Sequence, residues 1–287
     1  MTDPHLDPDR RHDVVFLFDV TDGNPNGDPD GNNAPRTDDE TGHGLVTDVA
    51  IKRKIRDTIP VLYPDEPGYS IFVEAGIALN TRFAQAIARA GAATDPAAQV
   101  AAMYYDARMF GAVLTQGPGK PAAQIRGPVQ VTFSRSIDPV MPVDHAITRV
   151  TQSRQADIDK GERTELGQKW TIPYGLYRGN LFYSPSRATK TGVTTDDLAA
   201  LWRTMQLIFE LDRTATRGVM ALCGLYVFSH RDRYGVAPWK TLDALVSIPG
   251  RQPDGPPARR HTDYQCTVDD TRLPDGVDLT VLAHAWN

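Results

Sequence analysis

A run of apolar, β-forming residues close to the start of the chain constrains the fold more than any other feature of the sequence. The run reads DVVFLFDV from Asp13 to Val20, and it is nearly continuous rather than alternating, which is typical of a buried strand. The next residues, TDGNPNGDPDGNNAPRTDDETGHG, repeat Gly, Asn, Asp and Pro and therefore predict a long loop. Because a loop of this length in a compact domain is usually functional or disordered, it is the first place to look for a site.

An amphipathic helix is predicted immediately after this loop, in the sequence LVTDVAIKRKIRDTIP. Thr47 is a suitable N-cap, and Asp48 in the first turn suits the helix dipole. Pro60 marks the expected end of the helix. The core-facing stripe consists of isoleucines that recur every four residues, at Ile51, Ile55 and Ile59.

Four cations fall within five residues of this predicted helix. At about 100° per residue, Lys52 and Arg56 flank the isoleucine stripe together. Arg53 lies opposite the stripe, and Lys54 lies on its other flank. A run of this kind is most often a solvated face. Here it follows a strand and a Gly/Asn-rich loop whose backbone N–H groups can hold phosphate oxygens, which favours contact with a nucleic-acid backbone.

Further polar and basic side chains strengthen this interpretation. Gln124, Arg126 and Gln130 supply hydrogen-bond donors next to an expected sheet strand. The segment 148–190 is also basic. Together these groups predict a positive groove that follows a single nucleic-acid strand. The cations of the basic segment are Arg149, Arg154, Lys160, Arg163, Lys169, Arg178, Arg187 and Lys190.

The remaining pattern predicts an α+β fold. In chain order, the expected elements after the basic helix are a short strand at 70–74, helices at 81–90 and 95–110, strands at 127–134 and 171–183, a helix at 196–211 and a strand at 219–229. The core order of strand, helix, strand, strand, helix, strand corresponds to the ferredoxin-like or RNA-recognition topology.

Two segments depart from that simple order. Residues 137–170 are polar and contain few large apolar side chains, so we expect an insertion that projects from the core. Residues 232–287 are rich in proline and poorly patterned, so we expect an irregular C-terminal segment. With these insertions, residues 1–287 are expected to form a single domain.

The overall charge is −5, which argues mildly against a nucleic-acid partner, but its distribution argues for one. The first 50 residues carry twelve acidic and three basic side chains, whereas the rest of the chain carries 24 acidic and 28 basic ones. The sequence contains no run of about 18 apolar residues, so we expect no membrane span. Its first residues are polar and do not resemble a secretory signal. Cys223 and Cys266 lie far apart in sequence, so we expect a reducing, cytoplasmic compartment.

Two alternatives involve metal ions in the first loop. Asp22, Asn24, Asn26 and Gly27 match the start of a calcium-binding loop, but Asn33 stands where that motif requires a bidentate Glu. Clustered carboxylates can also hold Mg²⁺ for phosphodiester cleavage. A metal-dependent endoribonuclease therefore remains the alternative function, with candidate ligands Asp19, Asp22, Asp28 and Asp30.

The stretch from Asp13 to Asp57 resembles the N-terminal signature of CRISPR-associated Cascade backbone subunits, the Cas-seven family. The pieces GNPNGDP and GHGLVTDVAIKRKIR most resemble the type I-C branch, called Csd-two. The similarity recurs over about residues 13–230, in IFVEAGIALN, MYYDARMFGAV, IRGPVQVTFSRSIDPV, HAITR and RGVMALCGLYVF.

This resemblance implies an RNA-recognition-like palm with insertions and a β-hairpin thumb, which maps to residues 137–170. In this family several copies line up along one CRISPR RNA, the thumb kinks the RNA at regular intervals, and the spacer bases stay exposed to pair with target DNA. The implied partners are CRISPR RNA, target DNA, further copies of the chain and other Cascade subunits. Type I members are not nucleases, so the resemblance implies no enzymatic activity, catalytic residue, metal or cofactor.

The resemblance also implies a set of RNA-binding residues. They are Lys52, Arg53 and Arg56 of the basic helix, together with Asn24, Asn26 and Arg126. Met141 and Ile147 are candidates for the thumb side chain that wedges the RNA.

Overall fold

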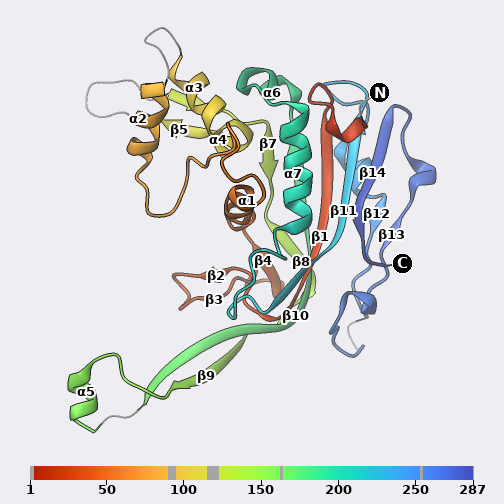
Figure 1. Cartoon of the computed structure of the whole chain (residues 1–287). Coiled ribbons are helices and arrows are strands. Elements are labelled where there is room, and N and C mark those ends of the chain that lie inside the picture. Colours follow the sequence, from red (N-terminus) through yellow and green to blue (C-terminus); the bar gives the residue numbers. More distant parts are fainter. Residues whose placement is uncertain (1–2, 90–94, 115–122, 162–163, 253–254, 287) are drawn as a thin grey trace.

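The computed structural model describes residues 3–89, 95–114, 123–161, 164–252 and 255–286. Within these residues, eight strands form an antiparallel sheet in the order β14-β11-β1-β10-β8-β4, with β7 and β9 also paired to β10 (Figure 1). The α+β class expected from the sequence is confirmed. The strands of this sheet are β1 (His12–Gly23), β4 (His43–Val46), β7 (Val129–Val131), β8 (Ser134–Pro139), β9 (Val143–Arg149), β10 (Glu165–Tyr183), β11 (Val219–His230) and β14 (Val277–His284).

Strand β1 lies at the centre of the fold because both of its faces are apolar. It pairs with β10 on one side and with β11 on the other. The side chains from Val14 to Phe18 are fully buried. Phe16 and Phe18 belong to the core on one face of the sheet, whereas Val15 and Leu17 belong to the core on the other. The prediction of a buried strand at 13–20 is therefore confirmed.

Helices α1 (Asp48–Leu62) and α7 (Thr195–Leu207) cover the face of the sheet to which Phe16 and Phe18 contribute (Figure 1). The isoleucine stripe of α1 is completely buried, as predicted. Thr47 caps α1 by accepting a hydrogen bond from the Ala50 N–H. Thr194 and Asp197 form a capping box at the start of α7. No helix among the described residues combines the length and the hydropathy needed to cross a bilayer.

The C-terminal segment covers the opposite face of the sheet, where Leu242 and Tyr264 pack against Val15 and Leu17. The prediction of an irregular segment at 232–287 is wrong for its last part, because β14 pairs with β11 from Gly224 to His230. β14 is a partly buried edge strand, and its first five residues, VDLTV, alternate between apolar and polar side chains, which is a strand signal that the sequence analysis missed. The remaining elements here are α8 (Trp239–Asp243), β12 (Val246–Ser247), η2 (His261–Asp263), β13 (Thr267–Val268) and η3 (Asp270–Arg272).

A small lobe lies beside the sheet and has its own core around Tyr104 and Phe72. The helix expected over 95–110 is divided in two, because Tyr104 adopts an extended conformation with φ −119°. The expected strand at 70–74 is wrong. Ser70 alone forms a bridge, to Tyr104, and the backbone N–H groups of Phe72 and Val73 donate to the Asp106 side chain instead. The lobe contains α2 (Leu79–Arg89), α3 (Pro96–Met103), α4 (Tyr105–Phe110), β5 (Ala112–Leu114) and β6 (Ala123–Ile125).

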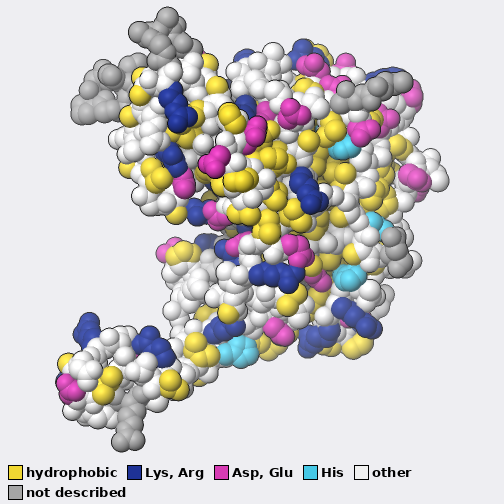
Figure 2. All heavy atoms as spheres, viewed as in Figure 1, with side chains coloured by type: hydrophobic (Ala, Val, Ile, Leu, Met, Phe, Trp, Pro, Cys, Tyr) yellow, Lys and Arg dark blue, Asp and Glu magenta, His cyan; other side chains and the backbone are white. Residues whose placement is uncertain are grey.

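A β-hairpin projects from the body of the molecule (Figure 1). It consists of β9 and the first residues of β10, which pair from Glu165 to Thr171, with the short helix α5 (Gln155–Asp159) at the tip. Figure 2 shows basic and hydrophobic side chains together on this hairpin. Its exposed apolar side chains are Met141, Ile147, Val150, Ile158 and Leu166. The other short elements of the chain are η1 (Pro4–Leu6), β2 (Gly27–Asp28), β3 (Ala34–Pro35) and α6 (Pro185–Thr191).

Candidate nucleic-acid interface

The loop between β1 and α1 is folded rather than extended, and β2 and β3 form a small hairpin within it. Asn26 anchors this loop to α1, because its Oδ1 accepts a hydrogen bond from the Thr47 N–H at 2.9 Å. Asn24 is buried, and its Nδ2 donates to the Asn33 carbonyl at 2.7 Å. These two asparagines, expected as RNA contacts, therefore hold the shape of the loop. The buried Asn24 Oδ1 has no hydrogen-bond partner among the described residues.

The same loop also reaches the projecting hairpin. Asn32 Nδ2 donates to the Gln168 Oε1 of β10 at 2.8 Å. Asn32 and Asn33 both have positive φ, which asparagine tolerates better than most residues. The loop thus bridges the start of α1 and the base of the hairpin, which lie far apart in the sequence.

The carboxylates considered for a Mg²⁺ site are not brought together. Asp28 forms an ion pair with Arg36 at 3.2 Å. Asp19 lies in β1 and its Oδ2 accepts a hydrogen bond from the Tyr174 hydroxyl at 3.2 Å. Among the described residues, the potential metal ligands close to Asp19 are Cys223 and His261. The loop carboxylates do not belong to this group.

Two cations of α1 are held by weak ion pairs on the helix surface. Lys52 Nζ lies 2.9 Å from Asp48 Oδ2, and Arg53 Nε lies 2.8 Å from Asp57 Oδ2. An exposed pair at i, i+4 spacing contributes only about 0.3–0.5 kcal/mol, so an incoming phosphate can displace Asp57 from Arg53. The Arg53 side chain is 44% exposed, the highest value among the four cations, whereas the Lys52 side chain is 17% exposed. Arg53 is therefore the most available cation of this helix.

The other two cations of α1 are tied to buried or half-buried carboxylates. Arg56 Nε donates to Asp106 Oδ2 at 2.8 Å, and the Asp106 side chain is 1% exposed. Lys54 forms a close ion pair with Asp212, and its side chain is 3% exposed. Removing one partner of such a pair leaves an uncompensated buried charge, at a cost of about 3–5 kcal/mol. Arg56, expected as a phosphate contact, thus faces inward and joins α1 to the small lobe.

A hollow of about 220 Å³ opens between the loop and α1. It brings together Asn24, Asn26 and Arg53, as the sequence predicted, but not Lys52 or Arg56. Arg217 also lines the hollow and was missed, because only the pairing of β1 with β11 carries it there. The approach is close enough that a Cβ on Gly23 would collide with the Arg217 carbonyl, so glycine is required.

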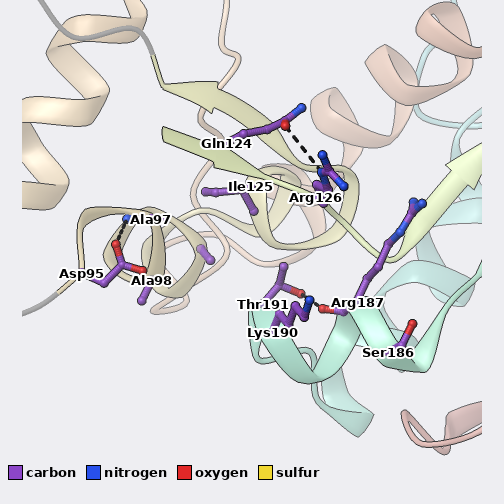
Figure 3. A pocket seen from close by; sticks show the side chains of 11 residues that line it. Asp95, Ala97, Ala98, Gln124, Ile125, Arg126, Ser186, Arg187, Lys190 and Thr191 are labelled. Carbon is purple, nitrogen blue, oxygen red and sulfur yellow. Dashed lines mark hydrogen bonds between the residues drawn. The ribbon is translucent and has the colours of Figure 1, made fainter. Parts of the chain in front are cut away.

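Arg126 lies in a different place from the other expected contacts. It lines a cleft of about 610 Å³ between α3, β6 and α6, together with Arg187 and Lys190 (Figure 3). This cleft and the hollow beside α1 have no lining residue in common.

The single basic groove expected from residues 148–190 is also divided. Arg149 and Lys160 have carboxylate partners within the hairpin, and Arg178 pairs with Asp243 at 2.7 Å under the C-terminal segment. Arg163 lies outside the described residues. Of the eight cations, Arg187 and Lys190 are thus the ones that line a cleft together with Arg126.

The structure is thus an α+β protein with two helices on one face of an antiparallel sheet, a projecting hairpin, and a cation-lined hollow between a surface loop and α1. The chain belongs to the CRISPR-associated protein Cas7 family, whose sequence profile matches residues 10–269. This is the family that the sequence resembles.

Individual relatives are similar over different extents. A CRISPR-associated protein Cas7 from Haloferax volcanii is 42% identical over 64 residues, a stretch that spans 22% of this chain and 17% of that protein. A chain of a solved CRISPR RNA-guided surveillance complex, in a pre-nicking state, has a TM-score of 0.52 at 12% identity, covering 79% of this chain and 80% of that chain. A chain of another CRISPR RNA-guided surveillance complex has a TM-score of 0.47 at 14% identity, covering 79% and 72%. The first of these structures shows a shared fold.

Proposed function

We propose that this chain is a CRISPR RNA-binding backbone subunit of a type I surveillance complex, Cascade, and that several copies assemble along one guide RNA. The observation that carries the proposal is the family match over residues 10–269, which includes the loop, α1, the hairpin and every strand of the sheet except β14. The fold shared with a chain of a CRISPR RNA-guided surveillance complex supports it. In this role the protein presents the guide for pairing with target DNA and has no catalytic activity of its own.

We further assign the chain to the type I-C branch, on the motifs GNPNGDP and GHGLVTDVAIKRKIR. The order β11-β1-β10-β8, with α1 and α7 on one face, supports an RNA-recognition-like palm. The hairpin of β9 and β10 supports the assignment of residues 137–170 as the thumb. Its exposed apolar side chains, Met141 and Ile147 among them, are suited to wedge between bases.

The RNA backbone is proposed to bind at the hollow between the loop and α1. Arg53 lines this hollow and supplies the phosphate contact there, since only a weak surface pair must be broken to free it. Lys52 lies outside the hollow and supplies a further phosphate contact along α1. Asn24 and Asn26 act by fixing the loop, so that its backbone N–H groups face the RNA. Arg56 supports the site through Asp106. Each copy needs only modest affinity, because contacts from several copies add along one RNA.

The experiment is to co-express the chain with a CRISPR RNA and to measure the RNA that remains bound after purification. We expect the Lys52→Glu, Arg53→Glu double variant to lose most of this RNA, with a steep decrease in affinity as salt increases. Arg272→Glu is the matched control, since Arg272 is an exposed cation with a local carboxylate partner in the C-terminal segment. Equal RNA content in the double variant and the control would overturn the assignment of the site.

A second measurement, the identity of the bound RNA, tests the proposed function itself. Sequencing of the RNA bound to the unmodified protein is expected to give repeat-derived ends around variable spacers. Random RNA fragments, or a complex with one copy of the chain on a full-length guide, would contradict the proposed function.

A further inference from the structure

The cleft that contains Arg126 has an unusual charge balance. Its cations Arg126, Arg187 and Lys190 come from two separate segments, and within the described chain none has a carboxylate oxygen within 4.0 Å. Asp95 is the acidic side chain in the lining, and it accepts a hydrogen bond from the Ala97 N–H at 3.1 Å as the cap of α3. All four cations of α1, by contrast, have carboxylate partners. The cleft is therefore a site of uncompensated positive charge.

This cleft continues into a second one. Ser186 and Arg187 of α6 line both the first cleft and an adjoining cleft of about 420 Å³. Figure 3 shows Arg187 on α6 and Arg126 on the facing segment, on either side of the opening. The second cleft adds Gln130, Arg233 and Tyr234, together with the ion pair of Arg11 and Asp13. Lys190 lines the first cleft, Arg187 lines both clefts and Arg233 lines the second. We call the two joined clefts the track.

The track also offers an aromatic surface. The Tyr234 side chain is 76% exposed and lies next to Arg233 in the second cleft. Hydroxyl and amide groups from Ser184, Ser186 and Gln130 line the same path. Cations at intervals bind phosphates, and an exposed aromatic ring stacks on a base of any identity, which is the combination used by proteins that bind single strands.

From these observations we infer that the two clefts form a second binding surface for a single-stranded nucleic acid, separate from the hollow beside α1. An acidic protein segment would satisfy the cations but would leave the exposed tyrosine ring unused. This inference rests on the proposed function in one respect: the guide RNA is taken to occupy the hollow beside α1. The occupant of the second surface is then a strand other than the guide, either DNA or RNA.

The test uses the complex that carries its guide RNA, titrated with fluorescently labelled oligo-dT and oligo-U of about 20 nucleotides. We expect the Arg187→Glu, Lys190→Glu double variant to bind the oligonucleotide at least about tenfold more weakly at moderate salt. The slope of log affinity against log salt should fall by about 1.4, which corresponds to two lost phosphate contacts on a single strand. Both side chains are exposed on α6, and equal thermal unfolding temperatures will show that the variant is folded.

Two further variants and one competitor make the test decisive. Tyr234→Ala should weaken binding of the oligonucleotide, whereas Arg272→Glu should leave it unchanged. Oligo-dT bound in preference to oligo-U, or the reverse, distinguishes a DNA strand from an RNA strand. The inference is overturned if the double variant binds as tightly as the parent, or if polyglutamate competes as well as oligo-dT while Tyr234→Ala has no effect.

Failure of the proposed function gives a separate result. If the purified protein holds no guide RNA, the backbone role fails, but the same titration on the RNA-free protein still tests the second surface. If guide RNA is retained and the oligonucleotide does not bind, the second surface alone is wrong.

Discussion

Arg56 Nε lies 2.8 Å from Asp106 Oδ2, and this contact joins the first helix of the fold to the small lobe. Asp106 is buried, and it also accepts hydrogen bonds from the backbone N–H groups of Phe72 at 2.7 Å and Val73 at 3.1 Å. The carboxylate thus organises the chain where the sequence suggested a strand. A cation that looked like part of an RNA-binding face is consequently part of the interior.

Replacing Arg56 by alanine should therefore act mainly on stability. We expect the free energy of unfolding to fall by about 3–5 kcal/mol, because Asp106 would remain buried without its cation. Arg53→Ala should cost less than about 1 kcal/mol, since its pair with Asp57 is on the surface. Chemical denaturation of both variants measures the difference. Equal stability of the two would mean that Arg56 is not a structural cation.

Stability should depend on pH through His12. This ring is fully buried, with Nδ1 3.0 Å from Ser229 Oγ and Nε2 2.9 Å from the Asp7 carbonyl oxygen. Burial lowers the pKa of His12 to about 3. The unfolded chain, with a pKa near 6.5, binds more protons between these values. The contribution is therefore complete above about pH 6.5 and decreases toward pH 3, by up to about 1.4 kcal/mol per pH unit.

The comparison variant for this pH dependence is His12→Gln, which keeps a polar group but does not titrate. Urea unfolding of both proteins at several pH values from 4.5 to about 7.5 isolates the His12 contribution, because the carboxylates titrate in both. The stability difference between the two should shrink as the pH falls. A difference that stays constant over this range would show that His12 is not held neutral in the folded protein.

The projecting hairpin should be dispensable for folding but not for assembly. The part of β10 from Glu165 to Thr171 pairs with β9, and the side chains along β9 are mostly exposed. Replacing residues 146–168 by a two-residue Asn-Gly turn, which keeps His145 opposite Lys169, should change the unfolding temperature by only a few degrees. The mass of the protein–RNA complex, measured by light scattering, should fall because neighbouring copies no longer engage. Normal assembly of this variant would remove the hairpin from the proposed mechanism.

The chain should not cleave RNA with Mg²⁺ or Mn²⁺. The loop carboxylates do not converge, and Asp28 is engaged by Arg36. Incubation of the protein with labelled RNA and either ion should give the same products as the Asp28→Ala, Asp30→Ala variant. Cleavage that is lost in that variant would instead support the endoribonuclease alternative.

The features that the sequence predicted well are those with a local cause. The apolar run of β1, the isoleucine stripe of α1 and the Thr47 cap each depend on residues within a few positions of one another. The asparagine loop and Arg53 line one hollow because the loop leads directly into the helix, and their contact with RNA stays a prediction.

The features that could not be predicted depend on contacts between distant parts of the chain. Asp106 is 50 residues from Arg56, and Asp212 is 158 residues from Lys54, so no spacing rule reveals either partner. Arg217 reaches the hollow only through strand pairing. Arg126 was grouped with all eight cations of the basic segment, and only the packing of α6 opposite β6 shows that Arg187 and Lys190 are the ones that share its cleft. A run of charge in a sequence therefore indicates cations but not which of them are free to bind a ligand.

Strand β10 is a single element of 19 residues that belongs to the central sheet at one end and to the hairpin at the other. At about 3.3 Å per residue it can reach roughly 60 Å. The length of β10 therefore sets how far the tip stands from the core, and in the proposed assembly it also sets the distance between one copy and the next. Inserting two residues would lengthen it by about 6.6 Å and keep every side chain on its face, whereas inserting one would invert the faces. In the proposed assembly, the spacing between copies can thus change only by an even number of residues in this strand.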